Sequence, residues 1–238
     1  MSRNIVIIGA SGTIGSSLVN IYKKNSDNQV YAFSRGYNYQ RDANLIMDDI
    51  DILDEGSMQK IVMKYFTESS IDILIIATGL LHNEIIFPEK SIREISLKKF
   101  QTVFNINTFA PALIFKHFFN SISRERKSIF AAFSARVGSI SDNKIGGWHS
   151  YRASKSALNM IIKNFSIEIS RKYKNNIIVG LHPGTVDSKL SKPFQKNVPT
   201  EKLFSGEYSA LKIVKVLDSL SIKDTGKCFD FNSLEVFP

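Results

Sequence analysis

Cysteine is almost absent from this chain, because Cys228 is the only one among 238 residues. A single cysteine cannot form an intramolecular disulfide, and it excludes any metal site with four cysteine ligands. A reducing cytoplasm is the simplest setting for such a chain. We expect Cys228 itself to be a small buried side chain near the last strand.

Long hydrophobic runs are also lacking. The longest apolar tract, Ile71 to Leu81, is interrupted by Asp72 and Thr78 and is shorter than the roughly 20 residues that a membrane span requires. The apolar part of the N-terminal segment is too short for a signal peptide and leads directly into a glycine-rich loop. The sequence therefore predicts a cytoplasmic protein with no membrane partner.

Two common hydrolase motifs are missing, since the chain has neither a Gly-x-Ser-x-Gly elbow nor a His-Glu-x-x-His sequence. These absences argue against a serine esterase and a zinc peptidase, and no metal site is predicted. The formal charge of +9 comes from 31 basic and 22 acidic residues that are dispersed along the chain. The one basic cluster, residues 124–127, suits a helix C-terminus, so we predict an anionic cofactor and no nucleic acid.

Apolar runs typical of strands alternate with segments of helical periodicity, which is the pattern of a parallel sheet covered on both faces. The expected strands are Asn4 to Ile8, Gln29 to Phe33, Leu45 to Met47, Ile71 to Ala77, Ser128 to Phe133, Asn176 to Leu181 and Lys227 to Phe231. The expected helices include Asp54 to Glu68, Leu97 to Asn120 and Tyr151 to Tyr173. We predict a single α/β domain over residues 1–238: a Rossmann-type, doubly wound parallel sheet of about seven strands, with substrate loops near 140–150 and 188–201.

A glycine-rich loop follows the first expected strand and precedes a helical pattern, the context that a dinucleotide-binding loop requires. Gly9 suits the tight turn, Gly12 allows backbone N–H groups to approach a pyrophosphate, and Gly15 allows the helix to pack against the strand. The alternative is a strand-to-helix connection that binds no ligand.

Tyr151 and Lys155 are spaced i and i+4, so on a helix both side chains can meet one substrate. The cation would favour phenolate and lower the tyrosine pKa, as general acid–base catalysis requires. Tyr208 and Lys212 have the same spacing in an amphipathic surface segment. A single pair is therefore compatible with a solvated lysine beside a partly buried tyrosine, and only the neighbouring motifs distinguish Tyr151.

These motifs occur in an order that resembles the short-chain dehydrogenase/reductase family over essentially the whole chain. In sequence they are the glycine loop 9–15, Asp51-Ile52, Ala77-Thr78-Gly79, Asn107, Ser134, Tyr151 with Lys155, and Pro183-Gly184-Thr185-Val186-Asp187-Ser188. The stretch from Ser134 to Lys155 is most similar to the short C-factor-like branch of that family.

The resemblance implies hydride transfer between a nicotinamide and a carbonyl or alcohol, with Tyr151 as general acid/base. Lys155 would lower the pKa of Tyr151 and hold the nicotinamide ribose, while Asn107 would hold a proton-relay water at a helix irregularity. The implied cofactor-binding residues are Gly9, Ser11, Gly12, Thr13, Ile14, Gly15, Ser34, Arg35, Asp51, Ile52, Ala77, Thr78, Gly79, Tyr151, Lys155, Pro183, Gly184, Val186 and Ser188.

Several of these residues keep a structural alternative. Asn107 could only cap or kink a helix, Asp51 could belong to a solvated acidic loop, and Ser188 could be a helix N-cap. The chain also departs from the family pattern at Thr13, which occupies the position of the usual second glycine.

The serine that should polarise the substrate carbonyl is a second departure. Counted back from Gly138, the usual position falls on Ala135, and adjacent side chains on a strand point to opposite faces. We predict that Ser134 supplies the hydroxyl through a shift at the strand end. Ser139 is another candidate, and the absence of any such hydroxyl remains a third possibility.

Cofactor choice depends on the end of the second strand, where an acid would bind the ribose hydroxyls of NAD. The chain has Ser34 and Arg35 there and no acid, and the planar guanidinium of arginine suits a phosphate. NADP(H) is favoured, while NAD(H) stays possible if Arg35 only stacks on adenine.

The predicted function is reduction of a small, hydrophobic carbonyl or oxidation of its alcohol. Trp148, Phe194 and Leu190 suggest the apolar pocket. The alternative is a C-factor-like signalling or regulatory protein that binds the nucleotide with little turnover, an interpretation that Ala135 supports. The family also implies a homodimer or homotetramer built on residues 97–120 and 151–173.

Overall fold

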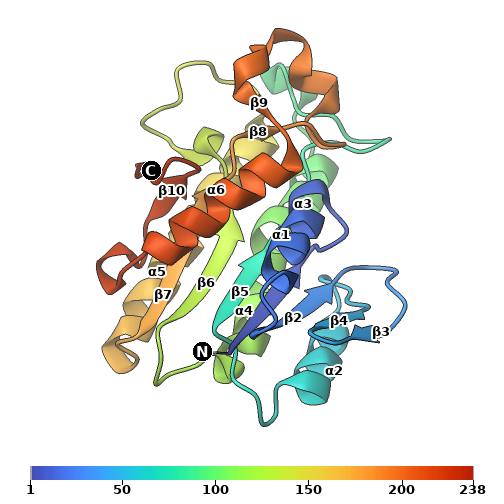
Figure 1. Cartoon of the computed structure of the whole chain (residues 1–238). Coiled ribbons are helices and arrows are strands. Elements are labelled where there is room, and N and C mark those ends of the chain that lie inside the picture. Colours follow the sequence, from blue (N-terminus) through green and yellow to red (C-terminus); the bar gives the residue numbers. More distant parts are fainter. Residues whose placement is uncertain (1, 238) are drawn as a thin grey trace.

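The computed structural model of the chain describes residues 2–237 and contains one large central sheet (Figure 1). Its strand order is β10-β7-β6-β5-β1-β2-β4-β3. The parallel strands are β1 (Arg3–Ile8), β2 (Asn28–Phe33), β4 (Leu45–Asp48), β5 (Ile73–Ile76), β6 (Ser128–Phe133), β7 (Asn176–His182) and β10 (Cys228–Asp230). β3 (Gln40–Asp42) is an antiparallel edge strand that the sequence analysis did not predict.

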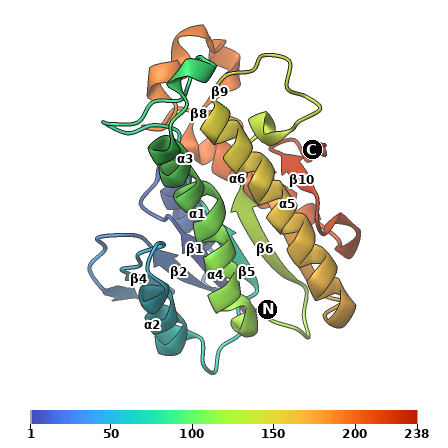
Figure 2. The same ribbon diagram turned by 180° about the vertical axis from the view of Figure 1, so that it is seen from behind.

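Helices cover both faces of this sheet, as predicted for a doubly wound fold. The helices α1 (Thr13–Lys23) and α6 (Gly206–Ser219) lie together on the face that Figure 1 presents. The opposite face, seen in Figure 2, is covered by α2 (Glu55–Tyr65), α4 (Ala110–Phe118) and α5 (His149–Lys172). A shorter helix, α3 (Leu97–Phe104), precedes α4.

The apolar strand runs supply two cores because side chains alternate between the faces of a strand. In β1, Ile5 and Ile7 pack with the α1 and α6 side chains, whereas Val6 and Ile8 pack with α2, α4 and α5. Each buried aliphatic side chain of this kind contributes roughly 1.5–3 kcal/mol. The strands are continuously apolar because both faces are covered.

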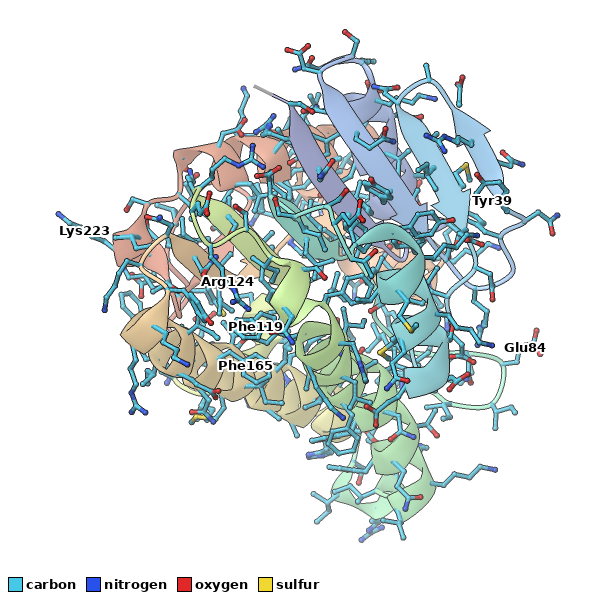
Figure 3. The ribbon with its side chains drawn as sticks, turned by 90° about the horizontal axis from the view of Figure 1, so that it is seen from below. Tyr39, Glu84, Phe119, Arg124, Phe165 and Lys223 are labelled. Carbon is cyan, nitrogen blue, oxygen red and sulfur yellow. The ribbon has the colours of Figure 1, made fainter. Side chains whose placement is uncertain are left out.

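Aromatic side chains fill the interface between α4 and α5. The ring of Phe115 in α4 lies 4.5 Å from Phe165 in α5 and 5.5 Å from Phe119. Figure 3, which views the molecule from below, shows Phe119 and Phe165 together where these two helices meet, with Arg124 close to Phe119. This packing holds α5 at Phe165 against α4.

The predicted long helix over residues 97–120 is interrupted. A π-turn at Asn105–Phe109 separates α3 from α4, and Asn107 lies at its centre. The helix irregularity that the family resemblance implied is therefore present. The loop expected at 140–150 ends earlier, because α5 already begins at His149. Two short 3₁₀ helices, Lys192–Asn197 and Thr200–Lys202, occupy most of the loop expected at 188–201.

The strand order reverses at β1, whose neighbours are β2 on one side and β5 on the other. A ligand crevice forms outside the carboxyl ends of the strands at such a switch point. The backbone N–H of Gly9 donates to the Phe33 carbonyl (2.9 Å), and that of Ala77 donates to the Ile8 carbonyl (2.8 Å). The glycine loop therefore lies at this point of the sheet. Across residues 2–237, no helix has the length and apolar character needed to cross a membrane.

Candidate active site at the carboxyl ends of the strands

Tyr151 and Lys155 lie on one face of the first turns of α5 and are buried, with 8% and 2% of their surfaces exposed. The Lys155 Nζ atom is 5.9 Å from the centre of the Tyr151 ring. It donates a hydrogen bond of 2.7 Å to the Phe133 carbonyl at the end of β6. The strand end thus holds the lysine, and the helix holds the tyrosine beside it.

The second pair of the same spacing shows which feature is distinctive. In α6 the Lys212 Nζ atom lies 5.7 Å from the Tyr208 ring centre, nearly the same separation. However, Tyr208 is 44% exposed, and Lys212 donates to the Asn232 side chain. Because spacing and distance agree, burial is the feature that separates the two pairs.

Burial determines the ionisation of this pair. It raises the pKa of Tyr151 to about 12 and lowers the pKa of Lys155 to about 7. The pKa of Tyr151 is thus raised and not lowered in this structure, because burial disfavours the phenolate, and the predicted effect of Lys155 on Tyr151 stays a prediction. Tyr151 therefore keeps its proton at neutral pH, which is the state of a proton donor.

Asn107 connects the loop after β5 to helix α5. Its Oδ1 accepts from the Leu80 N–H (2.8 Å), and its Nδ2 donates to the Leu80 carbonyl (2.8 Å) and the Ser154 hydroxyl (3.1 Å). These contacts hold the π-turn against α5, which agrees with the structural alternative for Asn107. The predicted water relay stays a prediction.

The structure does not bring Ser134 to Tyr151. Ala135 is extended (φ −154°, ψ 148°), so the two adjacent side chains point to opposite faces. The Ser134 hydroxyl donates to Asn159 Oδ1 (2.6 Å), while Ala135 packs against the buried cluster that contains Tyr151. The Ser139 hydroxyl accepts instead from the Asp142 N–H (3.2 Å). The expected shift at the strand end does not occur.

The glycine loop is built for close approach of backbone. Gly9 has φ +87°, and a Cβ there would lie 2.8 Å from Thr78 Cγ2. A Cβ on Gly15 would overlap the Gly9 carbonyl, so α1 can begin this close to β1 only with glycine. Thr13, the departure from the family pattern, lies against Gly206 at the start of α6, where a Cβ would be 2.6 Å from Thr13 Cγ2. Gly12 is extended at the N-cap of α1, followed by Ile14 in its first turn.

The residues predicted for the adenosine end lie near this loop. The hydroxyls of Ser11 and Ser34 are hydrogen bonded (2.5 Å), and Arg35 is exposed beside them in sequence. Asp51 Oδ1 accepts from the Leu53 N–H (2.9 Å), and Ile52 is half-buried against the core. Asp51 therefore stabilises a local turn, and its predicted contact with adenine stays a prediction.

Among the residues predicted for the nicotinamide end, Gly79 lies beside the buried pair. The Cβ direction of Gly79 points to within 3.8 Å of Lys155 Nζ and of Asn107 Oδ1. Ala77 is half-buried before it, and the Thr78 hydroxyl is buried without a hydrogen-bond partner in residues 2–237. After β7, Gly184 has φ +81°, the Pro183 carbonyl accepts from Ser209 (2.8 Å), and Val186 is buried. The Ser188 N–H donates to Ser191 (3.3 Å), and Ser191 rather than Ser188 precedes the next helix.

A cavity of about 520 Å³ opens beside Gly79 and Leu190. Its lining residues are Gly79, His82, Asn83, Glu84, Phe87, Lys189, Leu190 and Pro193. Aromatic rings connect this cavity to Tyr151, since Trp148 lies 6.2 Å from Tyr151 and 5.0 Å from Phe194, and Phe194 lies 5.5 Å from His82. The sequence analysis identified Trp148, Phe194 and Leu190 but missed His82 and Phe87. Their position in the loop that follows Gly79, a residue already predicted to bind the cofactor, could have identified them as cavity residues.

Comparison with protein families identifies one match that covers most of the chain. A family model described as short chain dehydrogenase matches residues 3–199. The chain is 28% identical to the C-signal protein of Myxococcus xanthus over 133 residues, which are 56% of this chain and 75% of that protein. It is 37% identical to 1-hydroxy-2-glutathionyl-2-methyl-3-butene dehydrogenase of Rhodococcus sp. (strain AD45) over 95 residues, which are 40% of this chain and 39% of that protein.

Solved structures share the fold over the full chain. The NADPH-bound carbonyl reductase from chicken fatty liver superposes with a TM-score of 0.86 at 23% identity, and the alignment covers 100% of both chains. The carbonyl reductase Sniffer of D. melanogaster gives a TM-score of 0.84 at 18% identity, again over 100% of both chains. At these identities the likeness establishes the doubly wound architecture.

The buried ammonium of Lys155 makes a measurable prediction for stability. With a pKa of about 7 in the folded chain and an ordinary value of 10.5, Lys155 binds its proton more tightly in the unfolded chain, so wild-type stability rises with pH between these values. We expect Lys155→Met to be more stable than wild type at pH 6 by on the order of 3 kcal/mol, with the difference shrinking toward pH 9. Urea unfolding at both pH values measures it.

Lys212→Met is the matched control, because it removes a lysine with the same spacing from a pair that is not buried. A Lys155→Met variant that is less stable than wild type at pH 6, or a difference that does not change with pH, would contradict the assignment.

Proposed function

We propose that this chain, which belongs to the short-chain dehydrogenase family, is an NADP(H)-dependent oxidoreductase that reduces the carbonyl of a small hydrophobic substrate. Family membership makes the chain an oxidoreductase, and the cofactor, substrate and residue roles are proposed. The observation that carries the proposal is the buried Tyr151–Lys155 pair at the sheet edge beside the glycine loop. The buried phenol has the protonation state that reduction requires.

The residues around the crevice fit a nicotinamide dinucleotide. Gly9 and Gly15 allow the glycine loop and the first turn of α1 to pack directly on the end of β1, and the exposed N-cap residue Gly12 leaves the N-terminus of α1 open to a pyrophosphate. Asp51 and Ile52 would contact the adenine ring, and Lys155 would hold the nicotinamide ribose. The Thr78 hydroxyl, which lies in the loop after β5 beside Gly9, is buried without a hydrogen-bond partner in the described residues. When bound, the cofactor supplies the hydride.

Tyr151 would donate its phenolic proton to the carbonyl oxygen as the C–H bond forms, which leaves an alcohol and a phenolate. Lys155 would then stabilise that phenolate electrostatically until a proton returns from solvent. Asn107 keeps the loop after β5 and the first turns of α5 in register through Leu80 and Ser154. No serine hydroxyl joins Tyr151 in this scheme, because Ser134 faces Asn159.

The substrate class follows from the side chains around Tyr151. Leu81, Ile86 and Val103 form a buried cluster with it, and Ala135, Val137, Trp148, Leu190 and Phe194 pack against them. An apolar or aromatic carbonyl compound fits these walls around Tyr151, while His82, Asn83, Glu84 and Lys189 add polar and charged groups to the lining of the adjoining cavity. C–O polarisation would come from Tyr151 alone.

The proton donor can be tested by replacing it. We expect Tyr151→Phe to lower kcat/KM for carbonyl reduction by about 100-fold or more while NADPH still binds, because the phenyl ring keeps the packing. NADPH consumption would be followed against aldehydes, ketones and quinones, with Tyr208→Phe as the control for the exposed pair. Unchanged turnover in Tyr151→Phe would contradict the proposed role.

A second candidate function is C-signal-like signalling by a nucleotide-bound protein with little turnover. Ala135 in the carbonyl-facing position favours it, because the usual second donor to the substrate is replaced by a methyl group. The same assay separates the two candidates when Ala135→Ser is included. A wild type that binds NADPH but reduces nothing, beside an Ala135→Ser variant that does turn over, would favour the signalling function.

The preference for NADP(H) rests on the turn after β2. Arg35 is exposed there, the Ser11 and Ser34 hydroxyls lie beside it in the loop, and no acid occupies residues 34–36. We expect Arg35→Ser to weaken NADPH binding by about 10- to 100-fold, since an arginine–phosphate contact is a charge-assisted one, with NADH affected less than threefold. Calorimetric titration of both cofactors would measure this, with the exposed Arg41→Ser as control. Equal losses for both cofactors would instead indicate stacking on adenine.

We also propose that the chain forms a homodimer or homotetramer through α4 and α5. Apolar side chains on or next to these helices are exposed, namely Phe109 (51%), Met160 (61%) and Ile167 (44%). Burial of exposed apolar side chains favours association. Light scattering at micromolar concentration should give at least twice the chain mass, and a monomeric mass would contradict the assembly.

A further inference from the structure

Glu89 is an acidic side chain buried completely in the loop between β5 and α3. Its exposed surface is 0%, whereas Glu84 and Glu94 in the same loop are exposed. Figure 3 shows Glu84 pointing away from the molecule. A carboxyl group is almost never fully buried unless it is hydrogen bonded or paired with an opposite charge.

The partner of Glu89 is the beginning of α5. Glu89 Oε2 accepts from the Ser150 N–H (3.1 Å) and from the Ser150 hydroxyl (3.0 Å). The Glu89 backbone carbonyl accepts from the Trp148 N–H (2.5 Å). Glu89 therefore accepts three hydrogen bonds, one from Trp148 and two from Ser150. These two residues flank His149 and lie just before Tyr151.

The start of α5 lacks a cap of its own. Gly146, Gly147 and Trp148 all have left-handed backbone angles, with φ of +68°, +66° and +50°. Trp148 occupies the N-cap position and makes no side-chain capping bond. The first N–H groups of a helix need acceptors, and a negative charge is favourable at that end. Glu89 supplies both from a loop that is about 60 residues away in sequence.

We propose that Glu89 is a positioning residue, which caps α5 from the substrate loop and thereby fixes Trp148 and Tyr151 relative to the cavity. The same loop contributes His82 and Phe87 to the cavity wall, and Trp148 packs on Phe194 at its other side. Glu89 thus connects the helix that carries the proton donor with the loop that forms part of the pocket. The catalytic part of this inference rests on the proposed function, while the structural part does not.

The test compares Glu89→Ala with Glu89→Gln. The glutamine amide can keep an oxygen on Ser150 and place its NH2 where Oε1 lies, which has no partner in residues 2–237. We expect Glu89→Ala to lower kcat by about 10- to 100-fold, because small displacements of a catalytic group cost this much, with KM for NADPH within twofold. Glu89→Gln should stay within about threefold of wild type. Glu94→Ala removes from the same loop an exposed carboxylate that accepts from the Lys90 N–H (3.1 Å) and not from α5, so it should leave kcat within about threefold of wild type.

Two readouts do not depend on turnover. Trp148 is the only tryptophan of the chain, so its fluorescence reports this contact directly. We expect Glu89→Ala to shift its emission to longer wavelength and to increase deuterium exchange in the peptide that contains residues 148–155, while the melting of the rest of the chain stays cooperative. Glu89→Gln should restore both signals.

The outcomes separate the two proposals. If wild type reduces no carbonyl, the proposed function fails, and emission and exchange still decide whether Glu89 caps the helix. Unchanged emission and exchange in a folded Glu89→Ala would overturn the cap. A cap that is lost with kcat unchanged would overturn the positioning of Tyr151, and equal losses of kcat in Glu89→Ala and Glu94→Ala would assign the effect to the loop in general.

Discussion

The hydrogen bond from the Lys155 ammonium to the Phe133 carbonyl, 2.7 Å long, is the contact on which the arrangement of the site depends. It fixes α5 to the end of β6, and the loop from β6 to α5 adapts to it. A Cβ on Gly138 would lie only 2.8 Å from Lys155 Cβ, so this loop can cross the lysine only with glycine. Because the ammonium is taken from water for a single neutral acceptor, its pKa falls to about 7. Such a cost is typical of a residue retained for function rather than for stability.

Most of the fold was predictable because strand and helix periodicities are local. All seven expected parallel strands are present, and Ile5, Val6, Ile7 and Ile8 alternate between the two cores as a strand buried on both faces requires. The edge strand β3 was missed, since Gln40, Arg41 and Asp42 are fully polar and pair only through backbone. The division of the helix over 97–120 was implied by the family resemblance, because apolar periodicity continues through a π-turn with little change.

The proximity of Tyr151 and Lys155 was predictable from the sequence, whereas the burial of this pair and the directions in which Ser134 and Ala135 point were not. Spacing places Tyr151 and Lys155 together, but the direction of each pKa depends on burial that only the packed structure defines. Ser134 and Ala135 differ by one strand position, and the sequence leaves open which of them faces the substrate side. The contact of Ser134 with Asn159 settles this geometry. Glu89 gave no sequence signal, because a buried acid after a proline looks like any acid in a polar loop until its partner at Ser150 is seen.

The methyl group of Ala135 changes what the rest of the site has to do. A substrate carbonyl that meets two hydroxyls is oriented by both, whereas one that meets only Tyr151 can rotate about a single hydrogen bond. Orientation must then come from the walls, which are Leu81, Ile86, Val103 and the rings of Trp148 and Phe194. These side chains belong to separate segments of the chain. The loop from Gly79 to Ser96 contacts α5 through its own residue Glu89, and its residue Leu80 is bonded to Asn107 of the π-turn. In an apolar surrounding the remaining hydrogen bond is also stronger than in water. In the proposed scheme, a site with one donor therefore requires that its walls and that donor be held in one rigid unit, and the contacts of Glu89 with Trp148 and Ser150, together with those of Asn107, would provide that connection.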